Sequence, residues 1–79
     1  MYFVYIIQSE SDQTFYTGMT ENLERRLQEH NAGIMKYSSA HKPWKLLYSE
    51  ECTTREEARN REKYWKSGSG REEREAMLS

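Results

Sequence analysis

The chain has 79 residues, of which 35% are hydrophobic and 32% charged, and its formal net charge is −1. This charge argues against a protein that holds nucleic acid through a polycationic face, so any such site must depend on a few placed cations. A chain of this length buries only about 60% of its unfolded surface, and we expect residues 1–79 to form one domain with a modest core. The single cysteine, Cys52, excludes an internal disulfide and suits a reducing compartment.

The sequence contains no apolar run long enough to span a membrane. Residues 1–7 are largely apolar, but the run is short and lacks the basic flank of a signal peptide. We therefore expect a cytoplasmic protein with no membrane partner.

The first 18 residues predict a β-hairpin. Residues 2–7 are a continuous β-prone apolar run, which is typical of a central strand covered on both faces. A polar turn follows at residues 9–13, and residues 14–18 are again β-prone. Tyr5 and Tyr16 are therefore expected on adjacent strands.

A helix is predicted after the hairpin, with Thr20 as its N-cap. Leu23 and Leu27 are four residues apart and mark the buried stripe of this helix. Arg26 and His30 each follow one of these leucines by three residues, so we expect both at the margin of the stripe, within reach of the sheet.

The middle of the chain predicts a third strand. The helix ends at a glycine, Gly33, and residues 34–42 are expected to form a loop. Residues 44–50 alternate roughly between apolar and polar side chains, which favours a strand. Trp44 and Cys52 are expected to be core residues at the two ends of this region.

The last third of the chain predicts two helices. Residues 54–57 form a capping box, residues 67–70 break the helix that follows, and residues 71–78 form a short final helix. Trp65 is expected in the core. The order β-β-α-β-α-α predicts an α/β fold with a small three-stranded antiparallel sheet flanked by helices.

Four side chains form a set suited to cutting a phosphodiester. A carboxylate such as Glu62 can hold a divalent metal, and Arg26 can hold a phosphate in its fork. Tyr5 or Tyr16 can relay a proton from water. Each residue also has a structural explanation: a strand tyrosine packs, a helix arginine is solvated, and Glu62 can form an exposed pair with Arg59 or Lys66.

The chain resembles the GIY-YIG nuclease family, in particular the small single-domain members related to the N-terminal nuclease domain of the excision-repair endonuclease subunit. Phe3-Val4-Tyr5 keeps the tyrosine of the first name motif, and Tyr16-Thr17-Gly18 keeps the tyrosine and glycine of the second. Asn-Leu-x-x-Arg-x-x-x-His at residues 22–30 and Glu62 complete the resemblance, which covers nearly the whole chain.

The resemblance implies roles for five residues. Tyr5 and Tyr16 resemble the two active-site tyrosines, and Arg26 resembles the arginine that contacts the scissile phosphate. Glu62 resembles the single carboxylate that binds the metal, Mg²⁺ or Mn²⁺, and His30 matches a position that is frequently His in small members. We expect Tyr5, Tyr16, Arg26 and Glu62 to converge on one concave surface.

The resemblance implies a metal-dependent DNA endonuclease that hydrolyses phosphodiesters, in DNA repair or recombination, with a repair protein as a further partner. Candidate contacts to DNA are Thr20, Asn22, Arg25, Lys36, Lys42 and Lys66. Met19 stands where some members have a lysine, which leaves two alternatives open: a non-catalytic nucleic-acid-binding module, or a protein–protein adaptor whose partner surface lies on residues 54–79.

Overall fold

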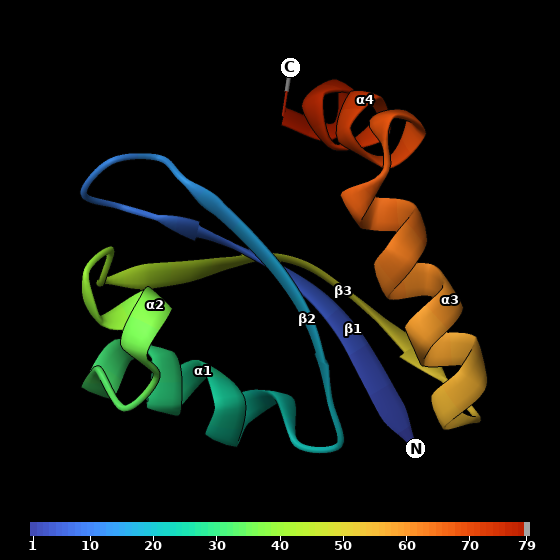
Figure 1. Ribbon diagram of the computed structural model, residues 1–79, viewed down its shortest axis with the longest axis horizontal. Helices are drawn as coiled ribbons and strands as arrows, with labels where there is room; N and C mark the ends of the chain where they lie inside the picture. Colours follow the sequence, from blue (N-terminus) through green and yellow to red (C-terminus); the bar gives the residue numbers. More distant parts are fainter. Residues whose placement is uncertain (79) are drawn as a thin grey trace.

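The computed structural model describes residues 1–78, with side chains described through residue 77, as a three-stranded sheet between two groups of helices (Figure 1). The elements are β1 (Tyr2–Ser9), β2 (Phe15–Thr20), α1 (Leu23–Ala32), α2 (Lys36–Ser39), β3 (Trp44–Cys52), α3 (Arg55–Lys66) and α4 (Gly68–Leu78). The strand order is β2-β1-β3, and both pairings are antiparallel. The predicted α/β class and the central position of β1 are confirmed.

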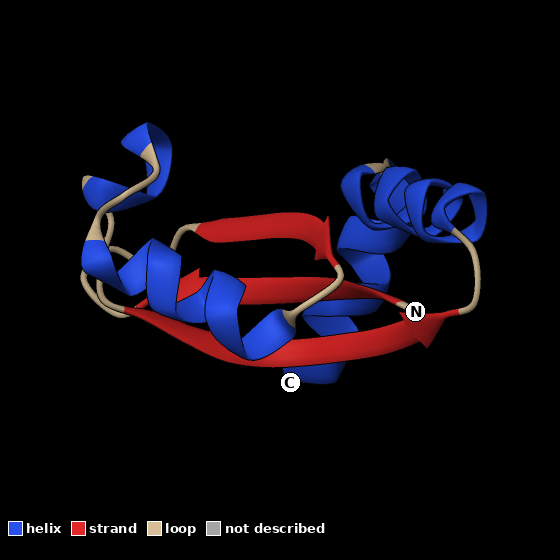
Figure 2. Ribbon diagram, turned by 90° about the horizontal axis from the view of Figure 1, so that it is seen from below, coloured by secondary structure: helices blue, strands red, loops and turns tan. Residues whose placement is uncertain are grey.

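The sheet has a core on each face because the side chains of β1 alternate between them. Tyr5 and Ile7 pack with Trp44 against α1, whereas Val4 and Ile6 pack on the side of α3. Figures 1 and 2 show α1 and α2 on one side of the sheet and α3 and α4 on the other. The two-sided cover explains why β1 reads as an uninterrupted apolar run.

The helix α3 is fixed to the sheet by one buried aromatic and one ion pair. Trp65 is 1% exposed and packs against Tyr48 with the two rings tilted, at 5.2 Å between ring centroids. The Trp65 indole N–H donates to Glu50 Oε1 at 2.9 Å, and Arg61 Nε donates to Glu50 Oε2 at 2.6 Å. These contacts fix the rotation of α3 about its own axis. They therefore also determine where the side chains on the far side of α3 point. The predicted core positions of Trp44, Trp65 and Cys52 are confirmed.

The N-terminus of α1 lies two residues later than predicted. Asn22 is the N-cap, and its Oδ1 accepts from the backbone N–H of Arg25 at 3.0 Å. Thr20 is the last residue of β2, and its hydroxyl oxygen accepts from the Asn22 N–H at 3.1 Å in the connecting turn. Asn and Thr are both good N-cap residues, so the sequence allowed the helix to begin after either Thr20 or Asn22. The strand β2 includes Thr20, and the helix therefore begins after Asn22.

Two further boundaries differ from the prediction. Residues 34–42 are not all loop, since Lys36–Ser39 form the short helix α2. The final helix begins at Gly68 instead of residue 71, so the predicted break shrinks to Ser67. Ser67 Oγ accepts from the Gly70 N–H at 3.3 Å, and this hydroxyl replaces a helical partner at the start of α4.

Gly70 allows α4 to pack tightly on the end of α3. A Cβ atom at Gly70 would lie 2.1 Å from the Tyr64 carbonyl oxygen and 2.6 Å from Trp65 Cα. Gly70→Ala is therefore expected to lower the free energy of unfolding by about 1–3 kcal/mol in urea titration. At Gly68 a Cβ would meet nothing within 4 Å, so Gly68→Ala should raise stability by about 0.4–1 kcal/mol. Equal stability of the two variants would contradict this packing.

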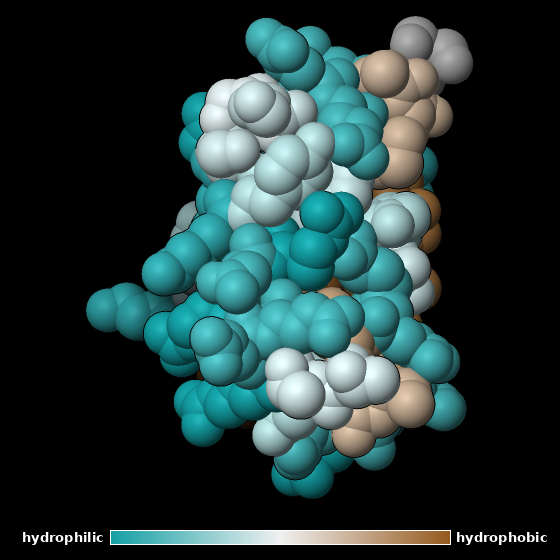
Figure 3. Space-filling model, turned by 90° about the vertical axis from the view of Figure 1, so that its right-hand side faces the viewer, coloured by the Kyte–Doolittle hydropathy of each residue, from teal (hydrophilic) through white to brown (hydrophobic). Residues whose placement is uncertain are grey.

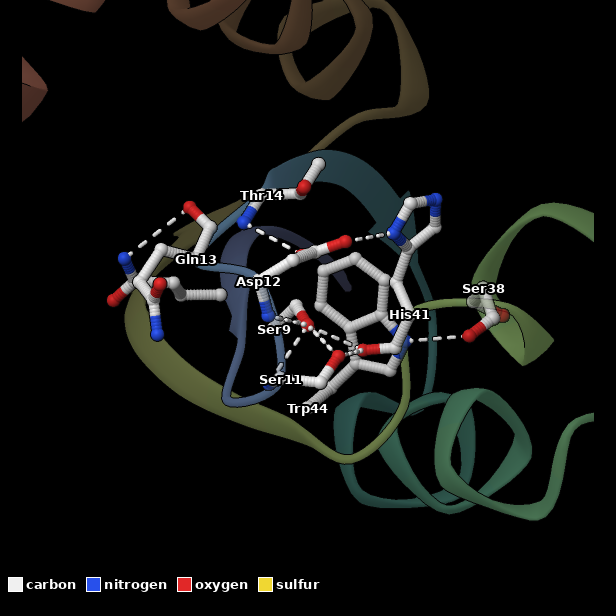
Figure 4. A network of polar contacts seen from close by, with 9 residues as sticks. Ser9, Ser11, Asp12, Gln13, Thr14, Ser38, His41 and Trp44 are labelled. Carbon is white, nitrogen blue, oxygen red and sulfur yellow. Dashed lines mark hydrogen bonds and ion pairs between the residues drawn. The ribbon is translucent and has the colours of Figure 1, made fainter.

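The β1–β2 turn is tied to the segment that precedes β3 (Figure 4). The His41 Nδ1–H donates to Asp12 Oδ2 at 2.6 Å, and the Thr14 N–H donates to Asp12 Oδ1 at 3.0 Å. Hydrogen bonds from the Thr14 side chain first, then from His41 and from the Thr14 N–H, hold the pKa of the Asp12 carboxyl well below its usual range. Nearby, the Trp44 indole N–H donates to the Ser38 carbonyl at 3.0 Å. The network fixes the end of β3 that carries Trp44.

The surface formed by α3 and α4 is hydrophilic over most of its area (Figure 3). Large apolar side chains that are exposed are scattered over the fold: Met1, Ile34, Tyr37, Leu46 and Met77. Met77 alone among them belongs to α3 or α4, so residues 55–77 do not present the apolar patch that the adaptor alternative expects. Within residues 1–78, every helix falls short of the length and apolar character that a membrane crossing needs.

Candidate active site

The two tyrosines meet on the α1 side of the sheet. Tyr5 pairs with Gly18 across β1 and β2, and its ring leans over that glycine. A Cβ atom at position 18 would lie 2.6 Å from the Tyr5 hydroxyl oxygen, so only glycine gives the ring this room. The ring centroids of Tyr5 and Tyr16 are 6.3 Å apart. Gly18 thus has a steric function in setting the position of the Tyr5 hydroxyl.

His30 lies beneath the tyrosines instead of at the margin of the α1 stripe. Its side chain is 0% exposed, its Nε2 is 3.0 Å from the Tyr5 hydroxyl, and its ring centroid is 4.9 Å from that of Tyr16. The apolar stripe that begins at Leu23 reaches His30 two turns later, because seven residues are close to two full turns. The predicted marginal position of His30 was therefore wrong.

The surroundings of His30 favour one tautomer. Its buried Nδ1 has no hydrogen-bond partner among the described residues. A hydrogen on Nδ1 would be an orphaned buried donor, which costs more than an unpaired acceptor. The hydrogen therefore belongs on Nε2, where it donates to the Tyr5 oxygen. This assignment leaves the proton of the Tyr5 hydroxyl free for another acceptor.

Both members of this pair are uncharged near neutral pH. Burial, followed by the neighbouring Tyr16 phenol, raises the pKa of Tyr5 above its ordinary value, and the charge of Arg26 opposes this rise. Burial, followed by the charge of Arg26, lowers the pKa of His30 below its ordinary value. Tyr5 is therefore a hydrogen-bond donor, held in place by a neutral imidazole.

The lowered pKa of His30 predicts a pH dependence of stability. The folded protein binds this proton less well than the unfolded chain, so the His30 contribution is fully present above about pH 6.5. It should decline as the pH falls below that value towards the folded pKa. Titration of the His30 Cε1 proton by NMR should give a midpoint below about 6.5. A midpoint at or above that value would contradict the buried, neutral imidazole.

A groove with a volume of about 630 Å³ lies beside the tyrosines, between α1, the end of β2 and α3. Its charged lining has arginines from both helices and glutamates near them: Arg25, Arg26, Arg55, Arg59, Glu21, Glu29 and Glu62. The lining therefore carries one more positive than negative charge, although the chain as a whole is at −1. The groove lining is therefore slightly cationic.

The groove brings together two of the four residues expected on one concave surface. Arg26 of α1 and Glu62 of α3 both line it, although their helices cover opposite faces of the sheet. Tyr5 is 2% exposed and lies below the groove, where the charges of Arg26 and Glu62 both act on its pKa. Tyr16 packs against Tyr5 and contributes to a separate cavity of about 190 Å³.

Glu29 holds the arginines of α1, and this residue was missed in the sequence. Its carboxylate lies 3.2 Å from Arg26 Nε and 3.4 Å from Arg25 Nε. Arg26 is 36% exposed at its side chain, so its orientation depends on Glu29 more than on burial. The spacing of three and four residues along α1 is the signal that could have revealed this support.

The predicted DNA contacts fall into two groups. Thr20, Asn22 and Arg25 line the groove with Arg26. Lys36 begins α2, and Lys42 lies near Gly33 at the C-terminal end of α1; neither lines the groove. Lys66 pairs with Glu62 at 3.2 Å and lines the smaller cavity.

Glu62 is the groove carboxylate that the resemblance assigns to a metal ion, and the protein offers few other ligands beside it. In residues 1–78 no cluster of three or more His, Cys, Asp or Glu side chains has the geometry to hold a metal. The Glu62 side chain is 21% exposed, and Lys66 approaches only its Oε2. One carboxylate fits a weak site for a hard cation, which wants six oxygens and would take the others from water and phosphate.

Comparison with known proteins identifies the family of the chain. Residues 1–75 match the GIY-YIG family, described as the GIY-YIG catalytic domain. A UPF0213 protein of Desulfotalea psychrophila is 44% identical over 63 residues, which are 77% of this chain and 56% of that protein. A UPF0213 protein of Clostridium perfringens is 43% identical over 67 residues, which are 84% of this chain and 71% of that protein.

A solved structure shares the fold. The solution NMR structure of a UPF0213 protein from Bacillus halodurans aligns with a TM-score of 0.58 and 29% identity, over 100% of this chain and 86% of that one. Against the Desulfotalea relative, the chain spans little more than half of the length. The chain therefore belongs to the GIY-YIG family of nuclease domains.

Proposed function

We propose that the chain is a divalent-metal-dependent DNA endonuclease that hydrolyses a phosphodiester held in the groove between α1 and α3. The observation that carries the proposal is that Arg26 and Glu62 line the two walls of one groove and that both charges act on the pKa of the buried Tyr5. A guanidinium and a carboxylate across a groove can bind a phosphate and its counter-ion at the same time.

Each residue has a defined task in this proposal. Arg26 donates to the non-bridging phosphate oxygens and offsets the charge that develops on them. Glu29 holds the guanidinium in position, since it already pairs with Arg26 at 3.2 Å. The Tyr5 hydroxyl, held by His30, would donate a hydrogen bond to a phosphate oxygen and keep its proton. Mg²⁺ or Mn²⁺ bound at Glu62 would supply a Lewis acid for the developing charge.

Met19 makes the groove different from a site with a lysine at this position. The Met19 side chain packs partly against the core around Trp65, and it offers no ammonium to the groove. The proton of the attacking water then passes to solvent, because Tyr5 is held as a hydrogen-bond donor. We expect slow turnover for this reason, with a rate that rises with pH because hydroxide becomes more abundant.

The proposal is tested by cleavage of labelled linear, flapped and branched DNA with Mg²⁺, with Mn²⁺ and with a chelator. Cleavage should require one of the two metals, and a role in repair or recombination predicts a preference for flapped or branched DNA. DNA binding without cleavage of any substrate in either metal would favour the non-catalytic binding module.

A further inference from the structure

A second pair of arginines faces the groove from α3. Arg55, Arg59 and Glu62 are spaced by four and then three residues, which places them on one side of the helix. All three line the groove. The same side of α3 thus carries the candidate metal ligand and two guanidinium groups in a row.

These two arginines differ from Arg25, Arg26 and Arg61, each of which forms an ion pair with a glutamate. Neither Arg55 nor Arg59 forms an ion pair with any residue in the described part of the chain, and both are exposed. Arg61, on the same helix, is instead bound to Glu50 at 2.6 Å. Two uncompensated charges beside a groove repel each other, and an anion in the groove would relieve that repulsion.

The groove is large enough to hold a ligand, and arginines stand on both of its walls. Its volume of about 630 Å³ is in the range of ligand pockets, roughly 300–1,000 Å³. Arg25 and Arg26 stand on the α1 wall, and Arg55 and Arg59 stand on the α3 wall. A polyanion of one strand can contact both walls, whereas the lysines of the opposite end of α1, Lys36 and Lys42, lie outside this groove.

We propose that Arg55 and Arg59 bind the backbone phosphates of a single nucleic-acid strand, adjacent to the phosphate at Arg26, so that the strand passes between α1 and α3. The assignment rests on the proposed function for the phosphate at Arg26. The planar fork of arginine suits phosphate oxygens, and contacts to the backbone carry no sequence preference. The two arginines therefore position the strand and do not select its sequence.

Binding of a fluorescent single-stranded oligonucleotide in metal-free buffer, measured over a range of salt concentrations, tests the path without requiring cleavage. Each phosphate contact contributes about −0.7 to the slope of log affinity against log salt for a single strand. Arg59→Ala should reduce the steepness by about 0.7, and the variant that also carries Arg55→Ala by about twice that amount. Arg59→Lys keeps the charge and should keep most of the slope.

Lys63→Ala is the matched control, because it removes one positive charge from α3 at a position outside the groove lining. It should leave the slope of the wild-type protein unchanged. Arg55 and Arg59 are exposed, so thermal unfolding of the alanine variants should match the wild-type protein.

Three results would overturn this path. An unchanged slope in the double alanine variant would show that neither arginine contacts a phosphate. A slope reduced by Lys36→Ala instead would show that the strand passes over α2. A loss seen with duplex but not with the single strand would overturn the one-strand geometry. The proposed function is tested separately. If binding depends on the two arginines but no metal supports cleavage, the nuclease activity is refuted and the phosphate contacts stand.

Discussion

Glu62→Gln is expected to abolish cleavage while sparing the binding of DNA. The amide keeps the shape of the carboxylate and removes its charge, so a hard cation loses its protein ligand. The cation is expected to contribute several kcal/mol to transition-state stabilisation, and that contribution should disappear. DNA binding should persist or improve, since one negative charge leaves the groove that holds the phosphate.

The fold should tolerate this change. Among the described residues Glu62 pairs with Lys66 alone, an exposed partner at 3.2 Å, and such surface pairs contribute at most about 1 kcal/mol. Glu56→Gln is the matched control, because Glu56 is exposed on the same helix and does not line the groove. Cleavage by Glu56→Gln should equal that of the wild-type protein. Full cleavage by Glu62→Gln would show that the metal assignment is wrong.

Arg26→Ala should reduce the rate of cleavage far more than it reduces stability. A donor aimed at developing charge contributes about 2–4 kcal/mol, which corresponds to a loss of about 30- to 1,000-fold in kcat. The Arg26 side chain is 36% exposed and flanks the core, so its truncation leaves no large cavity. Single-turnover cleavage and urea unfolding of the same preparation measure the two effects.

Arg26→Lys distinguishes charge from geometry. The ammonium keeps the positive charge but lacks the planar fork, so it should restore only part of the lost rate. Loss of Arg26 leaves Glu29 paired with Arg25 at 3.4 Å, which limits the disturbance of α1. Equal cleavage by Arg26→Ala and the wild-type protein on any cleavable DNA would refute the role of Arg26.

The sequence predicted the sheet well because the apolar pattern reports burial directly. The continuous run in β1 predicted a strand covered on both sides, and the structure confirms it between the cores around Trp44 and Trp65. Helix starts were less certain because Thr20 and Asn22 are both good caps, and only the length of β2 decides between them. The start of α4 depends on contact between Gly70 and Tyr64, which no local pattern reveals.

The individual site residues could be predicted from the sequence, but the groove that they line could not. The resemblance identified Arg26 and Glu62 one by one. The groove that they share is formed by α1, α3 and the end of β2 in the folded chain, so no sequence pattern shows it. His30 is seven residues after Leu23, close to two helical turns, and this spacing places it on the buried side of α1. The spacing of three residues from Leu27 pointed instead to the margin of that side. Arg55 and Arg59 share a helical side with Glu62 and could have been found from spacing once Glu62 was chosen.

The central claim is that Glu62 supplies a metal site inside the groove beside Arg26 and Tyr5. Paramagnetic broadening of backbone amide signals by Mn²⁺ tests it most directly, because the effect reports distance from the ion. Broadening should centre on Glu62, extend to the amides of Gly18 and Arg26, strengthen when a DNA strand is added, and vanish in Glu62→Gln. Broadening centred on the Asp12–His41 pair, with Glu62 unaffected, would contradict the account.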